Sequence, residues 1–237
     1  MRLDKLLSRL GAVRRSECRA LVKAGRILVN GTPPHGPETA VAAGDSITLD
    51  GKELDTRLER HVMLHKPGGV LTAAEDRRQK TVMDLLPPAY AALGCMPAGR
   101  LDKDTTGLLL LTTDGELAHR LLSPARHVEK TYIARVGGAL DAEDVSAFGA
   151  GLALGDFTAL PARLEILAPD TARVTVREGK YHQIKRMFLA RGKPVTALER
   201  TAFGPLTLDA ELAPGEWREL TEEERAALYR AAGMNHA

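Results

Sequence analysis

The spacing of apolar residues changes once along this chain of 237 residues, near residue 60, and the change constrains the fold. Before it, the four leucines between residues 3 and 10 recur at the spacing of one helix face. After it, short apolar or alternating segments predominate, and the longest aliphatic run is Leu108–Leu111. The pattern predicts two unequal domains, a small one over residues 1–58 and a larger one over residues 59–237.

Charge is distributed unevenly between these two parts. Residues 1–30 carry eight basic and two acidic residues, whereas residues 31–60 carry three basic and six acidic ones. The whole chain has a formal net charge of only +2, which excludes a histone-like protein and an acidic disordered chain. A compact basic head on a near-neutral body is typical of a module that binds a polyanion. The same head also fits a basic helical hairpin that docks on the protein itself.

The first fifty residues have the pattern of two short helices followed by a small β-ribbon. The leucine stripe ends at Gly11, and Ser16 is placed to cap a second helix over residues 17–24. Two segments typical of strands follow, each leading into a tight turn: residues 26–29 and 46–49. The charges alternate over residues 51–60, so we expect an exposed linker there.

This order of elements resembles the S4 RNA-binding domain. The resemblance implies that basic residues of the head hold folded RNA by its phosphates and shape, a contact that weakens with salt. The residues to which it assigns RNA binding are Arg2, Lys5, Arg14, Arg15, Arg19 and Lys23.

The body has the pattern of an α+β domain with a mixed, largely antiparallel sheet. Its predicted strands cover residues 62–66, 70–71, 108–112, 130–136, 161–168, 172–177, 194–200 and 206–208. Its predicted helices cover residues 116–122, 183–191 and 222–232, the last with a capping box from Thr221 to Glu224. Because strands predominate and no βαβ unit repeats, a doubly wound parallel sheet is excluded.

Two carboxylates precede the most apolar strand. Asp102 and Asp104 lie in a glycine-flanked turn at the edge of the predicted core, where the protein controls the ionisation and orientation of a carboxylate. The segment also fits a turn aspartate that binds its own backbone. A glycosidase pair is a third interpretation. However, residues two apart face the same side only on a strand, and the turn that follows Asp104 argues against a strand.

Five motifs in register resemble the pseudouridine synthases, in the form used by the bacterial branch that modifies small-subunit (16S) ribosomal RNA. They cover residues 65–69, 99–108, 129–132, 178–188 and 212–220. With the S4-like head, the resemblance extends over essentially the whole chain. It implies an isomerase that converts a specific uridine to pseudouridine without a cofactor or a metal ion.

The resemblance assigns catalytic roles to three residues. Asp102 matches the family's invariant aspartate, Tyr132 its ring-stacking tyrosine, and Lys185 the basic partner that keeps the carboxylate ionised. Other branches have arginine in place of this lysine, which lacks the bidentate fork, so Arg186 is the adjacent alternative. The residues alone also fit simpler roles. Lys185 and Arg186 fit phosphate contacts on a basic surface, and Tyr132 fits packing in the core.

Three further residues are expected to contact the substrate RNA. Leu198 matches the apolar residue that lines the uracil pocket, although a leucine there also fits plain core packing. Arg100 is placed to fill the gap left by a flipped base or to hold a phosphate, and Arg186 extends a basic segment suited to RNA.

The expected partner is ribosomal RNA, free or within an assembling small subunit. Residues 181–183 and 213–216 favour the 16S RNA over the large-subunit (23S) RNA of sister branches. A non-catalytic ribosome-assembly factor is the alternative from another class. We expect no membrane segment, because the apolar runs are short, and no signal peptide, because charges interrupt the first residues. The two distant cysteines favour the cytoplasm. We expect a monomer, because no long apolar stripe is left unassigned.

Overall fold

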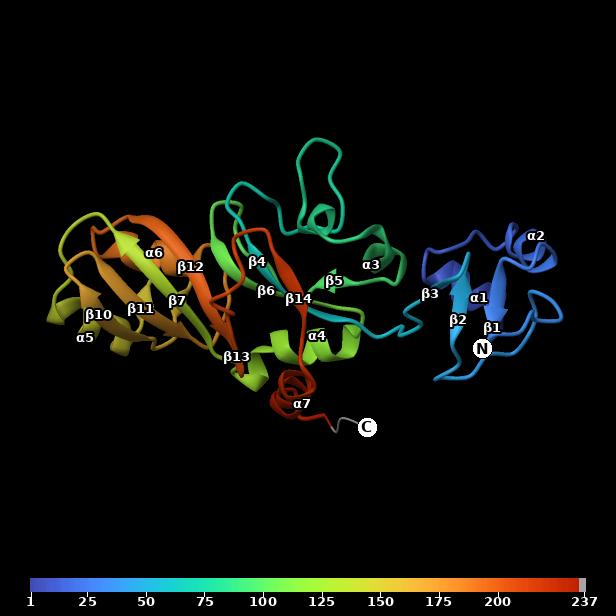
Figure 1. The fold of residues 1–237 in the computed structure, drawn as a ribbon. Coiled ribbons are helices and arrows are strands. Elements are labelled where there is room, and N and C mark those ends of the chain that lie inside the picture. The colour runs from blue at the N-terminus through green and yellow to red at the C-terminus, as the bar shows by residue number, and fades with distance from the viewer. Residues whose placement is uncertain (235–237) are drawn as a thin grey trace.

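The computed structural model describes residues 1–234, which form a small head and a larger body (Figure 1). The head contains α1 (Leu3–Arg9), α2 (Cys18–Lys23), β1 (Ile27–Val29), β2 (Ile47–Leu49) and β3 (Lys52–Glu53). The strands of the body are β4 (His61–Lys66), β5 (Met96–Pro97), β6 (Thr106–Thr112), β7 (Lys130–Val136), β8 (Leu152–Ala153), β9 (Thr158–Ala159), β10 (Arg163–Ala168), β11 (Thr171–Val176), β12 (Val195–Phe203), β13 (Leu206–Thr207) and β14 (Trp217–Glu219). Its helices are η1 (Val82–Leu85), α3 (Pro88–Ala92), α4 (Gly115–Leu122), η2 (Pro124–Arg126), α5 (Ala142–Ala150), α6 (Gln183–Ala190) and α7 (Glu222–Ala231).

In the head, the two predicted helices pack on a small sheet. The leucine stripe of α1 is buried against residues of β1 and β2, which pair antiparallel, and β3 adds a third strand to the predicted ribbon. Ser16 does not cap α2, so that prediction is wrong. The residue before the helix is Glu17, whose backbone is helical and whose N–H binds the carbonyl of Arg14. The chain therefore enters α2 through a preceding turn rather than from an extended cap.

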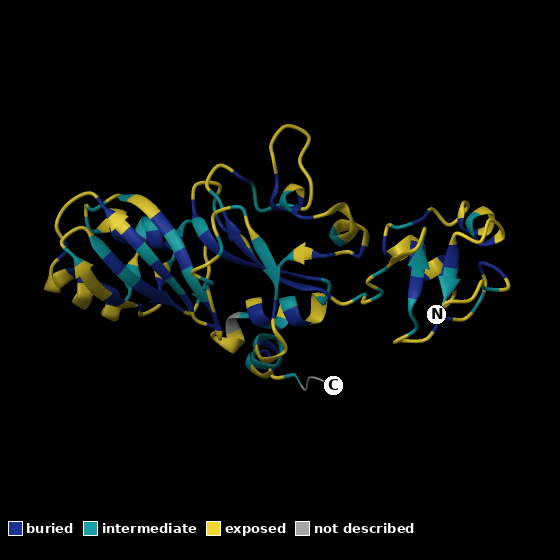
Figure 2. Ribbon diagram, in the orientation of Figure 1, coloured by how far each residue is buried: buried dark blue, intermediate teal, exposed yellow. Residues whose placement is uncertain are grey.

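The body is built on one nine-stranded sheet, which confirms the predicted α+β architecture. Its main path runs β10-β11-β7-β12-β6-β4-β14, and its named pairings are antiparallel except that of β12 with β6. Helices α5 and α6 bury Phe148 and Phe188 in the core on one face, while α4 and α7 bury Leu117 and Leu228 in a second core on the other. Buried residues accordingly follow the central strands in Figure 2. No helix within residues 1–234 has the length and apolar character needed to cross a membrane.

Two predictions about connecting segments are wrong. Residues 70–71 form no strand, because Leu71 makes only an isolated bridge to Thr81. The segment 51–60 is not exposed throughout, since it begins in β3 and ends in Arg60, which is only 6% exposed. In both cases the partner comes from elsewhere in the fold, so the local pattern of the sequence does not show it.

The head and the body are joined by apolar and ionic contacts. Leu93, which follows α3, is buried in the hydrophobic cluster of the head. Glu219 of β14 binds the segment between the two parts, at 2.7 Å from Arg60 and 2.9 Å from Arg57. These contacts fix the end of the head's chain on the edge strand of the body's sheet.

The close approach of β6 to β12 gives a first prediction. Gly107 has φ +100°, and a Cβ atom there would lie 2.3 Å from the carbonyl oxygen of Arg200. We expect Gly107→Ala to lower the free energy of unfolding by about 3 kcal/mol or more, because neither backbone can yield. Urea denaturation measures this loss. Gly115→Ala, with open space at the start of α4, is the control and should change stability by less than about 1 kcal/mol. Equal effects of the two substitutions would contradict this account.

Candidate active site

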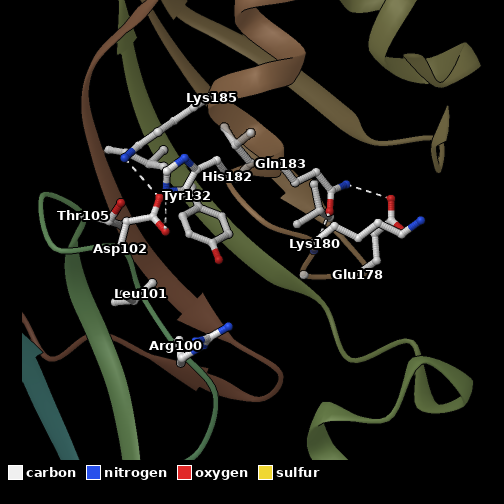
Figure 3. Close-up of a pocket in the computed structure, with 14 residues that line it drawn as sticks. Arg100, Leu101, Asp102, Thr105, Tyr132, Glu178, Lys180, His182, Gln183 and Lys185 are labelled. Atoms are coloured by element: carbon white, nitrogen blue, oxygen red, sulfur yellow. Dashed lines mark hydrogen bonds and ion pairs between the residues drawn. The ribbon is translucent and has the colours of Figure 1, made fainter. Parts of the chain in front are cut away.

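A pocket opens on the sheet beside the start of α6 (Figure 3). Its walls come from the loop before β6, from β7 and β12, and from the segment leading into α6. The residues that matter for its chemistry are Asp102, Thr105, Tyr132, His182, Lys185 and Leu198. Residues far apart in the sequence thus converge on one cavity.

Hydrogen bonds from the segment after β4 hold the loop that carries Asp102. The hydroxyl of Thr72 donates to the carbonyl of Leu101 at 2.8 Å and accepts from its N–H at 3.2 Å. The N–H of Gly69 binds the carbonyl of Lys103 at 2.8 Å. Two of the sequence motifs, residues 65–69 and 99–108, therefore form one unit in which the first clamps the second.

Lys66 is the centre of this clamp. Its side chain is fully buried, and its Nζ donates to the carbonyls of Pro67, Lys103 and Thr105 at 3.1, 3.2 and 2.9 Å. Burial lowers the pKa of Lys66 to about 8, although the carboxylates of Asp104 and Asp102 act in the opposite direction. Sequence reasoning did not single out this residue, because a lysine beside a Pro-Gly-Gly turn has the appearance of a surface residue.

Lys185 lies between the two carboxylates of the loop. Its Nζ is 3.0 Å from Oδ2 of Asp102 and 2.5 Å from Oδ1 of Asp104. Burial acts to lower the pKa of Lys185, but hydrogen bonds to Asp104 and Asp102 outweigh it and raise the pKa. The same hydrogen bond from Lys185 holds the pKa of Asp104 below its usual value.

Only one of the two carboxylates belongs to the pocket. Asp102 is 28% exposed and lines the cavity, whereas Asp104 is 74% exposed and does not. This arrangement argues against a glycosidase, which needs both carboxyl groups to flank the scissile bond.

Tyr132 and Leu198 form an apolar wall beside Asp102. In the antiparallel pairing of β7 with β12, Tyr132 is opposite Arg200 and Ala134 is opposite Leu198. Both wall residues therefore point to the same face of the sheet. They are 9% and 7% exposed, so each packs in the core while lining the cavity.

The segment before α6 is fixed by a buried amide. Gln183 accepts a hydrogen bond from the N–H of Lys180 at 3.2 Å and donates to Glu178 at 2.8 Å. His182 then takes a left-handed conformation with φ 49°, and its Nε2 faces Oδ1 of Asp102 at 3.4 Å. In the sequence these residues stand out only as parts of a motif, because no local pattern distinguishes a buried glutamine from an exposed one.

The remaining predicted site residues lie outside this group. Arg100 is exposed at the rim of the pocket. Arg186 turns away from Asp102 and binds Asp156 and the carbonyl of Leu154, so the structure gives it no contact with the reactive carboxylate.

The six basic residues of the head that were predicted to bind RNA fall into two groups. Arg2 and Arg15 pair with Asp4, at 2.9 and 3.2 Å. The others are exposed and make no ion pair with any described residue: Lys5, Arg14, Arg19 and Lys23. Since Arg19 and Lys23 are four residues apart on α2, they share one face of that helix.

The pocket suits a flat, polar ring. It offers the face of Tyr132, an apolar contact from Leu198, and a carboxylate that forms an ion pair with a lysine. Across residues 1–234, no three histidine, cysteine, aspartate or glutamate side chains are grouped as metal ligands.

Each of the two parts of the chain matches the model of a known family. The model of the family described as RNA pseudouridylate synthase matches residues 60–190, and that of the S4 domain matches residues 1–47. A crystal structure of a pseudouridylate synthase, 34% identical in sequence, superimposes with a TM-score of 0.68 over 96% of this chain and 99% of that one.

Curated relatives match over almost their full length. An RNA pseudouridine synthase of Bacillus subtilis is 46% identical, covering 94% of this chain and 96% of its own. The ribosomal small subunit pseudouridine synthases A of Vibrio cholerae and Escherichia coli are 39% and 38% identical, covering 97% and 96% of this chain and all of theirs.

The clamp at Lys66 gives a second prediction. Replacing Lys66 by methionine removes three hydrogen bonds to backbone carbonyls, so the Asp102 loop should open more often. We expect amide hydrogen exchange at Gly69 and Thr105 to accelerate about tenfold or more. Lys103→Met, which removes only an exposed bond to Gln79, is the control and should leave exchange at both amides unchanged. Unaltered protection in the Lys66 variant would show that the loop is held without this ammonium group.

Proposed function

Because the chain belongs to the RNA pseudouridine synthase family, we propose that it isomerises a uridine of small-subunit ribosomal RNA, with Asp102 as the catalytic carboxylate. The observation that carries the proposal is the ion pair between Asp102 and Lys185, 3.0 Å long, in a pocket walled by Tyr132. The choice of substrate is supported by relatives that are named for the small subunit and match nearly the whole chain.

The reaction needs no atom from outside the nucleotide. The bond from N1 of uracil to C1′ of ribose breaks, the ring turns, and a bond from C5 to C1′ forms. C5 loses a proton and N1 gains one, so nothing is oxidised or reduced. Asp102 acts by adding to the ring, by attacking C1′ or by removing the C2′ proton, and each route requires its ionised form.

The neighbours of Asp102 have separate roles in this proposal. Lys185 compensates the charge of the carboxylate through the 3.0 Å ion pair. Tyr132 stacks on the uracil and is placed to handle the C5 proton, while Leu198 closes the apolar side of the slot. The target base is stacked in folded RNA, so it must be flipped out, and Arg100 at the rim fills the gap or holds a phosphate.

The head supplies affinity in this proposal. We place its boundary with the body near residue 58 and assign RNA contact to its exposed basic residues. Because Arg2 and Arg15 share an ion pair with Asp4, which offsets one of their two charges, the phosphate contacts fall mainly to the unpaired residues. Arg186 contributes to the RNA surface rather than to the chemistry.

The catalytic carboxylate gives a third prediction. Asp102→Asn keeps the shape of the side chain but removes its charge, so turnover should fall by about 10³-fold or more. Tritium release from C5-labelled transcripts of ribosomal RNA measures turnover, and filter binding should show an RNA affinity within about twofold of the wild type. Asp170→Asn, exposed and outside the pocket, is the control and should retain full activity. Full activity of the Asp102 variant would contradict its role.

The same assay tests the substrate. Release by the wild-type protein from the small-subunit transcript alone is the expected result. Release from the large-subunit transcript alone would keep the chemistry and overturn the target. Binding without release, on transcripts and on partly assembled small subunits alike, would instead favour a non-catalytic assembly factor.

The head gives a fourth prediction. Replacing Arg14, Arg19 and Lys23 by glutamine should weaken RNA binding and flatten its salt dependence. The slope of log K against log salt should fall by roughly 0.7–0.9 for each phosphate contact removed. Arg173→Gln, on the body and paired with Glu165, is the control and should leave the slope unchanged. An unchanged slope in the triple variant would show that the head binds no phosphate.

A further inference from the structure

Lys185 holds only one side of the catalytic carboxylate. An ammonium group is a point charge and lacks the planar fork with which arginine binds both oxygens of a carboxylate. Its Nζ is 3.0 Å from Oδ2 of Asp102, and it is shared with Asp104 at 2.5 Å. A carboxylate held at one oxygen can still turn about its bond to Cβ, so Oδ1 needs a second partner.

His182 is the residue that faces Oδ1. The Nε2 atom of its ring lies 3.4 Å from this oxygen, while Nζ of Lys185 lies beside the other oxygen, Oδ2 (Figure 3). The ring is half-buried and stacks on Tyr181, with centroids 3.8 Å apart and planes at 18°. The contact is a little longer than a hydrogen bond, as is common for catalytic contacts before substrate binds.

The backbone gives His182 this position. Its φ of 49° turns the chain into α6, and its carbonyl accepts a hydrogen bond from the N–H of Arg186 at 2.9 Å. The buried amide of Gln183 fixes the preceding loop through Lys180 and Glu178. Residues other than glycine rarely adopt the left-handed backbone conformation, and here it directs the side chain of His182 into the pocket.

We propose that His182 is a positioning residue that donates a hydrogen bond from Nε2 to Oδ1 of Asp102. With Lys185 on Oδ2, it provides from two side chains the two-point hold that a single arginine would give. The carboxylate plane is thereby fixed, and the remaining lone pairs of both oxygens are directed at the substrate. This inference rests on the proposed role of Asp102 as the catalytic carboxylate.

The test uses three variants of the full chain. His182→Ala removes the donor. His182→Gln places an amide N–H at the reach of Nε2, and His182→Asn carries a shorter amide in a residue that accepts the left-handed backbone well. The rate constant of a single turnover is measured with saturating protein on the C5-tritiated small-subunit transcript, together with RNA affinity.

We expect His182→Ala and His182→Asn to lower the single-turnover rate by about 10- to 100-fold, with RNA affinity within about twofold of the wild type. His182→Gln should recover most of the lost rate, because it restores a donor at Oδ1. A rate for His182→Ala within about twofold of the wild type would overturn the proposal. Equal rates for His182→Gln and His182→Asn would also overturn it. The rate would then depend on how well the residue accepts the left-handed backbone and not on a donor at Oδ1.

A parallel measurement separates this inference from the function on which it rests. If Asp102→Asn is inactive while His182→Ala is unimpaired, only the positioning role fails. If Asp102→Asn turns over at the wild-type rate, the proposed function itself fails, whatever the His182 variants do.

Discussion

The geometry of the pocket depends on one buried ammonium group. Lys66 has three N–H donors and no acceptor, and each donor has a carbonyl to bind, from Pro67, Lys103 and Thr105. Since β4 pairs with both β6 and β14 in the sheet, this contact ties the Asp102 loop to the rigid centre of the body. A loop without secondary structure thereby gains the fixed position that catalysis requires.

Each carboxylate of the loop has a compensating ammonium group nearby. Lys66 and Lys185 accompany Asp102 and Asp104, and Arg100 and Lys103 of the same loop add further positive charge. RNA brings many phosphates, and an unbalanced carboxylate would repel them. The two ammonium groups offset this repulsion. The arrangement also explains why a lysine is tolerated in the interior, because its charge is compensated nearby by Asp104 and Asp102.

Sequence patterns correctly predict the helices and strands that depend mainly on residues close together in the chain. The leucine stripe of α1, the apolar strand β6 and the capping box that begins α7 are confirmed, and the predicted helices and long strands match within three residues. Helix α5 was missed although its start carries a capping box between Asp141 and Asp144. A more apolar face would have drawn attention to it.

Tertiary partners determine the rest, which sequence reasoning could not supply. The burial of Arg60 depends on Glu219, 159 residues away, and residues 70–71 are held by loops rather than by a strand. The same limit applies to the candidate site. The motif containing Lys185 pointed to Asp102. The contact of His182 with Asp102, however, depends on a left-handed turn that no residue pattern predicts.

The division into head and body separates affinity from selection. Phosphate contacts add binding energy without reading sequence, and the head carries exposed cations that no acid of the described chain neutralises. The pocket, by contrast, presents one aromatic face, one apolar side chain and one carboxylate, which is enough to hold a single base. Because the contacts that join head and body involve Leu93 and Glu219 rather than the pocket, we expect substitutions at Asp102 to leave the position of the head unchanged.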